Sequence, residues 1–245
     1  KDAILEDKDY IGMSNDSAIS YSLGVLKPGE SVEFLLYILI EENKNFKTID
    51  ELEEKIANLK KLDAKKEYEQ AKKYWSNYLS KHDSLKIDDD QNKNVSQKVK
   101  EIYKRTILLF PLLRNEETGG ISAAVEVDEN LENSGRYSYC WPRDAVFITK
   151  ALDILNMTKE TEKFYDSFCR KTQSPNGMWE QRFYTDGTLA PCWGYQIDET
   201  ASVIFGVYDH YVKTKDEKFL YNNLKMCENA LGFLFKYLDN VFNKK

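Results

Sequence analysis

The sequence contains few of the residues that form metal sites or disulfide frameworks. Among its 245 residues there are four cysteines and two histidines, all widely spaced and without a Cys-x-x-Cys pair. They are Cys140, Cys169, Cys192, Cys227, His82 and His210. This spacing supports neither a zinc site nor a set of disulfides. We therefore expect buried free thiols and no cofactor or metal.

Long apolar runs and basic blocks are also missing. No apolar run approaches the roughly 20 residues that a membrane-spanning helix needs. The net charge is −6, and no cluster of basic residues is interleaved with aromatic ones. These absences argue against a membrane span and against nucleic acid as a partner. The chain begins at Lys1, with neither an initiator Met nor a signal peptide, so we expect a fragment whose cellular compartment stays open.

Residues 17–40 are rich in residues that favour β-strands, in two runs separated by Lys27–Glu30. Pro28 presets φ for the second position of a turn and Gly29 tolerates a positive φ at the third, which predicts a type II turn. Two strands alone are marginal in water. We therefore expect this hairpin to be the edge of a larger sheet domain or to pack on the helices that follow.

Two amphipathic helices are predicted between residues 48 and 80. Thr48 and Glu51 form a capping box, and apolar residues then recur at helical spacing among many charges. The polar residues 84–94 are expected to be a solvated connection. We expect the two helices to lie against a neighbouring domain.

From residue 95 onward the pattern is mainly helical. Helices are predicted at 95–113, 144–155, 159–171, 198–213 and 217–239, with glycine-bearing loops between them. No strands alternate with these helices, which argues against a parallel α/β fold. The pattern is typical of an α/α barrel or a helical bundle, and we expect its loops to meet at one open end.

The loop residues 137–144 read Tyr-Ser-Tyr-Cys-Trp-Pro-Arg-Asp. Aromatic rings offer flat apolar faces on which a sugar can stack. The Arg143–Asp144 pair offers donors and a carboxylate acceptor for hydroxyl groups. The segment could equally be an aromatic strand end in which the Arg and Asp form an ion pair. Taken alone, the motif leaves both interpretations open.

Four loop motifs follow one another in a characteristic order. They are Gly120–Ala124, Tyr137–Asp144, Gly177–Gln181 running to Asp186-Gly187, and Trp193–Thr200. In order and spacing they resemble the glucoamylase family of glycoside hydrolases, which also includes glucodextranases and some trehalases. The likeness is greatest to bacterial members, and it covers residues 95–240 more closely than residues 1–90.

The resemblance implies a mainly α fold with an (α/α)6 barrel. Residues 1–46 would be the C-terminal part of a β-sandwich domain, residues 47–93 a helical linker, and residues 94–245 the first part of the barrel. The family removes glucose from the non-reducing ends of starch-like or dextrin α-glucans, with inversion of configuration. The expected partner is therefore an α-glucan oligosaccharide or polysaccharide, and the missing C-terminal half of the barrel is a further expected partner.

The resemblance also assigns roles to residues of the octapeptide. In the family the Arg-Asp pair holds hydroxyls of the terminal glucose, which here are Arg143 and Asp144. The Trp and the first Tyr line the same subsite, which here are Trp141 and Tyr137.

Further substrate-binding candidates lie in the last motif. Trp193 matches an aromatic residue of the pocket wall, and Gln196 and Asp198 match polar residues of the same loop. For Asp198, the alternative role is an N-cap of the following helix, and both roles can coexist. We expect Glu199 to be a surface charge that the helix dipole favours.

The chain departs from the family in its catalytic residues. The general acid and base of the family would lie beyond Lys245, so the catalytic residues are unknown within this chain. Glu180 imitates the acid motif but precedes the Trp193 loop. An incomplete barrel would leave apolar helix faces without partners, namely at Val203, Val207, Leu231 and Leu234. We expect the remainder to be missing from this sequence or to be supplied by another polypeptide.

Three functions are compatible with these observations. The first is an exo-acting, inverting glucan hydrolase, of which this chain alone would be inactive. The second is a non-catalytic glucan-binding or regulatory protein with a glucoamylase-like barrel. The third is a helical scaffold whose aromatic loops only pack. The preferred glucosidic linkage stays open.

Overall fold

The structure is a computed structural model, and it describes residues 20–40, 47–125, 137–192 and 194–242. The described residues are mostly helical and form no β-strand. None of their helices is both long and apolar enough to cross a membrane. The chain divides into two compact units, Lys1–Gln70 and Ala71–Lys245, which are described separately.

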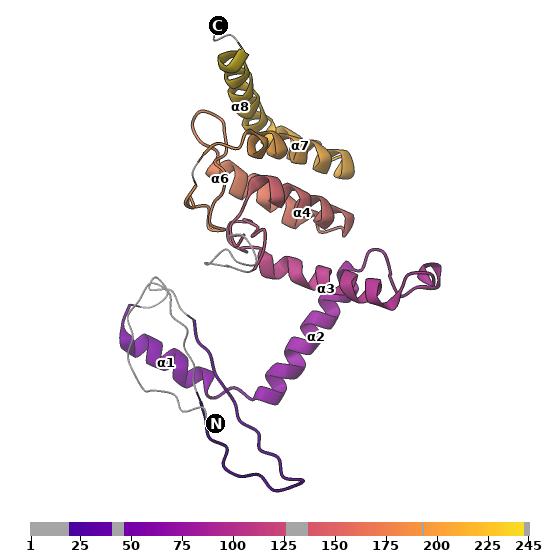
Figure 1. The fold of residues 1–245 in the computed structure, drawn as a ribbon, viewed down its shortest axis with the longest axis vertical. Helices are drawn as coiled ribbons and strands as arrows, with labels where there is room; N and C mark the ends of the chain where they lie inside the picture. The colour runs from indigo at the N-terminus through magenta and orange to yellow at the C-terminus, as the bar shows by residue number, and fades with distance from the viewer. Residues whose placement is uncertain (1–19, 41–46, 126–136, 193, 243–245) are drawn as a thin grey trace. The chain divides into compact units, whose positions relative to one another are not determined.

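In the first unit, residues 20–40 form two segments joined by a turn (Figure 1). The Glu30 N–H donates to the Lys27 carbonyl at 3.0 Å and Gly29 has φ +87°, so the predicted turn is confirmed. The predicted strands do not form in residues 20–40, where many apolar side chains stay exposed rather than packing on a second layer. Residues 1–19 and 41–46 lie outside the described residues, so the sandwich domain stays a prediction.

Helix α1 (Ile49–Leu59) begins where the capping box predicts. The Glu51 N–H donates to Thr48 Oγ1 at 3.3 Å, and the Glu51 carboxylate accepts the Lys47 N–H at 2.7 Å. The carboxylate therefore reaches the residue before the N-cap rather than the N-cap itself. Helix α2 (Ala64–His82) follows, so both predicted helices are confirmed.

The second unit contains the remaining helices, whose bounds lie close to those predicted (Figure 1). They are α3 (Gln97–Leu113), α4 (Pro142–Ile154), α5 (Thr158–Lys163), α6 (Arg170–Thr172), α7 (Ile197–Thr214) and α8 (Glu217–Phe242), with a short 3-10 turn at Asp90–Asn92. Helix α4 begins two residues earlier than predicted because Pro142 suits the first helical position. The predicted helix at 159–171 is divided by a π-helical segment, Phe164–Cys169.

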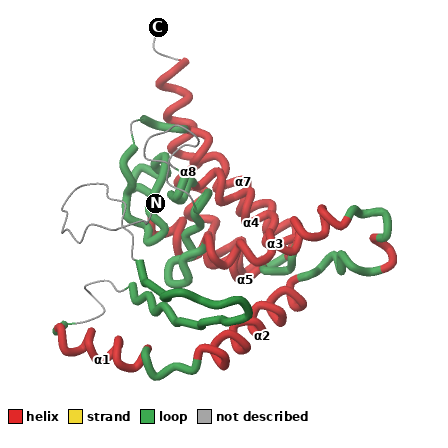
Figure 2. The backbone as a smooth tube through the Cα atoms, turned by 60° about the horizontal axis from the view of Figure 1, so that its bottom comes forward, coloured by secondary structure: helices red, strands yellow, loops and turns green. Residues whose placement is uncertain are grey.

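Helix α7 packs against α4 on one side and α8 on the other, and Figure 2 shows these helices side by side. Val203 and Val207 of α7 are completely buried in this core, so the expectation that they lack partners is wrong. Both face neighbouring helices within the second unit. Leu231 is exposed, as expected, and Leu234 is half-buried. Closure into an (α/α)6 barrel stays a prediction.

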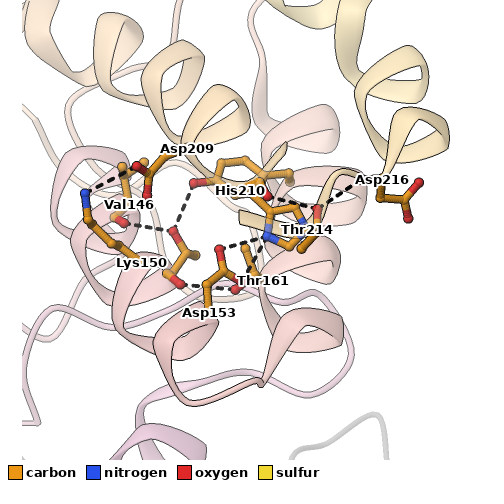
Figure 3. A network of polar contacts seen from close by, with 10 residues as sticks. Val146, Lys150, Asp153, Thr161, Asp209, His210, Thr214 and Asp216 are labelled. Atoms are coloured by element: carbon orange, nitrogen blue, oxygen red, sulfur yellow. Dashed lines mark hydrogen bonds and ion pairs between the residues drawn. The ribbon is translucent and has the colours of Figure 1, made fainter. Parts of the chain in front are cut away.

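A polar network lies within this packed region (Figure 3). His210 of α7 contacts Asp153 of α4, and the Thr149 and Tyr165 hydroxyls lie 2.9 Å apart. Thr161 of α5 donates to the Thr149 carbonyl at 3.2 Å. Since these groups are buried, their mutual hydrogen bonds offset the cost of removing them from water. The network therefore fixes α7 relative to α4.

All four cysteines are free, and Cys140, Cys169 and Cys227 are buried. Burial raises the thiol pKa of Cys140 and of Cys169 well above the ordinary value, and that of Cys227 to about 11. The prediction of buried free thiols is thus confirmed for these three, which are held in the unreactive neutral form.

Candidate functional site

Three loops of the second unit meet at the start of α4. The Ala123 and Ala124 N–H groups donate to the Tyr139 and Tyr137 carbonyls at 2.9 and 3.0 Å. On the other side, Cys140 and Phe183 exchange two backbone hydrogen bonds of 2.8 and 2.9 Å. Backbone hydrogen bonds therefore hold the loop of residues 137–144 between its two neighbouring loops, as expected from the grouping of the loop motifs.

Arg143, the second residue of α4, is the centre of a charged cluster. Its Nη1 donates to Asp198 Oδ2 at 2.6 Å and to Gln196 Oε1 at 3.0 Å. Its Nη2 donates to Asp144 Oδ2 at 3.4 Å. The fold thus brings together four of the predicted site residues from the starts of α4 and α7, which are about 50 positions apart in the sequence. These contacts and the surrounding acids raise the pKa of Arg143 despite its partial burial, which keeps it charged.

Two of the carboxylates that meet Arg143, those of Asp144 and Asp198, are partly open to solvent. The side chain of Asp144 is 38% exposed and that of Asp198 is 58% exposed. Asp198 lies in the first turn of α7, whose N-cap is Gln196, so the N-cap role considered for Asp198 is wrong. Its carboxylate turns to Arg143 instead. Both aspartates retain accepting capacity that faces water and that a ligand could use.

Glu199 lies behind this cluster and is completely buried. The expectation that it is a surface charge is therefore wrong: α7 presents it to the start of α4. Its Oε2 accepts the backbone N–H of Arg143 at 2.7 Å, and its Oε1 lies 3.2 Å from Arg143 Nη1. Burial raises the pKa of Glu199 to about 7, against the opposing effect of Arg143.

Two of the three aromatic residues of the motif, Tyr139 and Trp141, lie against a second arginine. The Arg182 guanidinium lies over the Tyr139 ring at 4.8 Å and over the Trp141 ring at 5.3 Å, and its Nε donates to the Pro191 carbonyl at 2.6 Å. Such stacking on two rings stabilises a buried cation and holds the rings in place. Arg182 was not predicted from the sequence, although a basic residue within the third motif was a signal that could have suggested it.

The remaining candidates differ in exposure. Tyr137 is 46% exposed and Trp141 is half-buried, so both offer aromatic surface in the segment that leads into α4. Trp193 lies outside the described residues. The Glu180 side chain is half-buried and makes no hydrogen bond or ion pair with the described part of the chain. Trp179 beside it is buried, where its Nε1 donates to the Cys169 carbonyl at 2.9 Å.

This arrangement suits a neutral, hydroxyl-rich ligand. A fixed guanidinium and two partly exposed carboxylates supply donors and acceptors, and the segment that leads into α4 carries partly exposed aromatic residues. The acids that surround Arg143 outnumber it, which disfavours an anionic ligand such as a phosphate.

Comparison with known proteins gives one distant relative. An uncharacterized glycosyl hydrolase of Methanocaldococcus jannaschii is 27% identical over 234 residues, which cover 94% of this chain and 35% of that protein. The chain thus spans about a third of the length of this relative. No protein-family profile and no solved structure matches the chain.

Proposed function

We propose that the protein to which these 245 residues belong is a glycoside hydrolase that removes glucose from the non-reducing ends of α-glucans, with inversion of configuration. The distant relative named as a glycosyl hydrolase supports glycoside hydrolysis in general. The narrower assignment, to the glucoamylase type and to α-glucosidic bonds, rests on the order of the four loop motifs.

The Arg143–Asp144–Asp198 cluster is the observation that carries the proposal. In it, one guanidinium orients two carboxylates whose oxygens remain partly open to solvent. A carboxylate that is already oriented accepts a sugar hydroxyl without paying the cost of ordering itself. We assign Tyr137, Trp141 and Trp193 to the wall of the same subsite. We further propose that Gln196 orients the Arg143 side chain.

The chemistry of inversion needs two further carboxyl groups. One protonates the leaving oxygen and the other activates a water, and they lie about 6.5–9.5 Å apart. We propose that both lie outside these 245 residues and that the present cluster binds and orients the terminal glucose. The cluster then contributes to catalysis by strengthening its hydrogen bonds to the sugar in the transition state.

The test is proton NMR of the complete natural polypeptide with maltopentaose, in which the anomeric signals report the first product. We expect β-glucose to appear before mutarotation. Asp144→Asn should lower kcat/KM by roughly a hundredfold or more, because a charged acceptor is lost. The matched control is Asp50→Asn, an exposed aspartate that is also in the first turn of a helix.

Each outcome decides between functions. Release of α-glucose would contradict inversion, and unchanged hydrolysis by Asp144→Asn would contradict the assignment of this subsite. Binding of maltopentaose without any hydrolysis would favour a glucan-binding or regulatory protein.

A further inference from the structure

The first turn of α4 receives no cap from its own neighbours. Trp141 is the N-cap residue but makes no side-chain capping bond, and Pro142 has no N–H. The N–H of Arg143 is therefore the first donor of the helix that needs a partner. Glu199 supplies it from the first turn of α7, 56 residues later in the sequence, at 2.7 Å. One helix thus caps another.

The same carboxylate also faces the side chain of Arg143. Glu199 Oε1 lies 3.2 Å from Arg143 Nη1, and no group in the described part of the chain donates a hydrogen bond to it. Glu199 therefore contacts Arg143 at its backbone and at its guanidinium. A residue held at both ends has little freedom to turn its guanidinium away from Asp144 and Asp198.

Capping alone does not explain a glutamate at this position. A glutamine has the same length, and its carbonyl oxygen could accept the Arg143 N–H without the cost of a buried charge. A carboxylate at a completely buried position is useful only if its charge acts on a neighbour. The charged neighbours are Arg143 and Asp144 of α4 and Asp198 of α7 itself, and the nearby Cys140 thiol is neutral. Of these, Arg143 is the only one that a negative charge attracts.

We propose that Glu199 is a positioning residue of the sugar subsite, whose carboxylate fixes the Arg143 guanidinium and through it the two aspartates that accept sugar hydroxyls. This role rests on the proposed function of the cluster. Glu199 itself touches no sugar, because it is completely buried behind Arg143.

The role predicts a pH dependence of sugar binding. Burial raises the pKa of Glu199 to about 7, so its charge is present above that pH and is lost below it. Glucose has no group that titrates between pH 5.5 and 8.5, roughly one and a half units on either side of that pKa. Its affinity for the protein therefore reports the ionisation of the protein alone, and it should be greater at the alkaline end.

The test is calorimetric binding of D-glucose, which cannot be hydrolysed, to the complete natural polypeptide between about pH 5.5 and 8.5. We expect the wild-type affinity to rise roughly three- to tenfold through pH 7. Glu199→Gln should show the weaker affinity at every pH. The matched control is Glu217→Gln, an exposed glutamate in the first turn of α8, which should behave like the wild type.

Amide hydrogen exchange at Arg143 gives a second measurement that needs no sugar. The Arg143 N–H should exchange slowly in Glu199→Gln, whose amide oxygen can cap α4, and rapidly in Glu199→Ala. Slow exchange in Glu199→Gln also shows that this variant is folded at the site.

The outcomes separate the two proposals. If the wild type binds neither glucose nor maltopentaose at any pH, the proposed function of the cluster fails. If the wild type binds glucose but Glu199→Gln binds it equally well at pH 8.5, the proposed function of the cluster is retained and the positioning role of Glu199 is wrong.

Discussion

His210 Nδ1 lies 2.9 and 2.8 Å from the two carboxylate oxygens of Asp153, and this buried pair joins α7 to α4 (Figure 3). The His210 side chain is 1% exposed and that of Asp153 is 5% exposed. The Phe219 ring of α8 packs edge-on against the His210 ring, with 4.4 Å between the ring centroids. This packing helps to shield the pair from water. The two helices that this pair joins are also the ones that carry Arg143 and Glu199.

Removal of one partner should therefore destabilise the protein strongly. His210→Ala leaves the Asp153 carboxylate buried without its partner, and we expect the free energy of unfolding to fall by about 3–5 kcal/mol. Urea unfolding followed by circular dichroism measures the change. The comparison is Asp209→Ala, which removes the partly exposed pair with Lys150 and should cost about 1 kcal/mol or less. Equal costs for the two substitutions would contradict a special role of the buried pair.

The helices were largely predictable from the sequence, but this pair was not. Helix positions follow from local signals, such as the capping box of Thr48 and the apolar spacing along α3. His210 and Asp153 are 57 residues apart and carry no shared motif, so only the packing of α7 on α4 brings them together. The strands expected in residues 17–40 do not form in the part that the structure describes, residues 20–40, because strand formation depends on pairing and packing that local sequence does not supply.

The candidate site, too, was predictable from the sequence only in part. The sequence placed Arg143, Asp144, Gln196 and Asp198 in one site, because motif order carries that information. It placed Glu199 on the surface, because an acid in the first turn of a helix is usually solvated. The direction in which a first-turn residue points depends on the neighbouring helix, and here that neighbour is the uncapped start of α4.

Gly206 of α7 and Gly232 of α8 should respond in opposite ways to substitution by alanine. A Cβ at Gly206 would lie 2.0 Å from the hydroxyl oxygen of Tyr165, which is completely buried and hydrogen-bonded to Thr149. A Cβ at Gly232 would meet nothing within 4 Å. Gly206→Ala should therefore cost about 1–3 kcal/mol, through overpacking.

The expected gain from Gly232→Ala is about 0.5–1 kcal/mol, because alanine is the better helix former. Thermal unfolding of both variants beside the wild type provides the measurement. Stabilisation by Gly206→Ala would show that α7 and the π-helical segment are not packed as closely as the structure has them.

Glu199 should make the stability of the protein fall as the pH rises. Its pKa is raised from 4.5 to about 7 in the folded protein, so the unfolded chain loses this proton at lower pH than the folded one. Between these values the unfolded state is favoured increasingly, and above pH 7 the full penalty of about 3 kcal/mol is present. Below pH 4.5 the carboxyl is protonated in both states and the penalty is gone.

Glu199→Gln removes this penalty because its amide stays neutral. The variant should thus match the wild type in unfolding free energy near pH 4.5 and exceed it at pH 8. Urea unfolding at both pH values tests this, and Glu217→Gln again serves as the exposed control. A stability difference that is the same at both pH values would contradict the ionisation of a buried Glu199.

Arg143→Lys separates a sugar-binding role from a purely structural one. Lysine keeps the positive charge but has a single nitrogen, which cannot reproduce the fork that meets Asp144 on one side and Asp198 and Gln196 on the other. We expect kcat/KM for maltopentaose to fall roughly ten- to a hundredfold, whereas unfolding free energy should change by about 1 kcal/mol or less, since the cluster is partly exposed. Arg170→Lys, at an exposed pair with Asp166, is the control and should leave kcat/KM unchanged. A helical scaffold whose loops only pack predicts the reverse, with stability lowered by Arg143→Lys and sugar affinity unaffected.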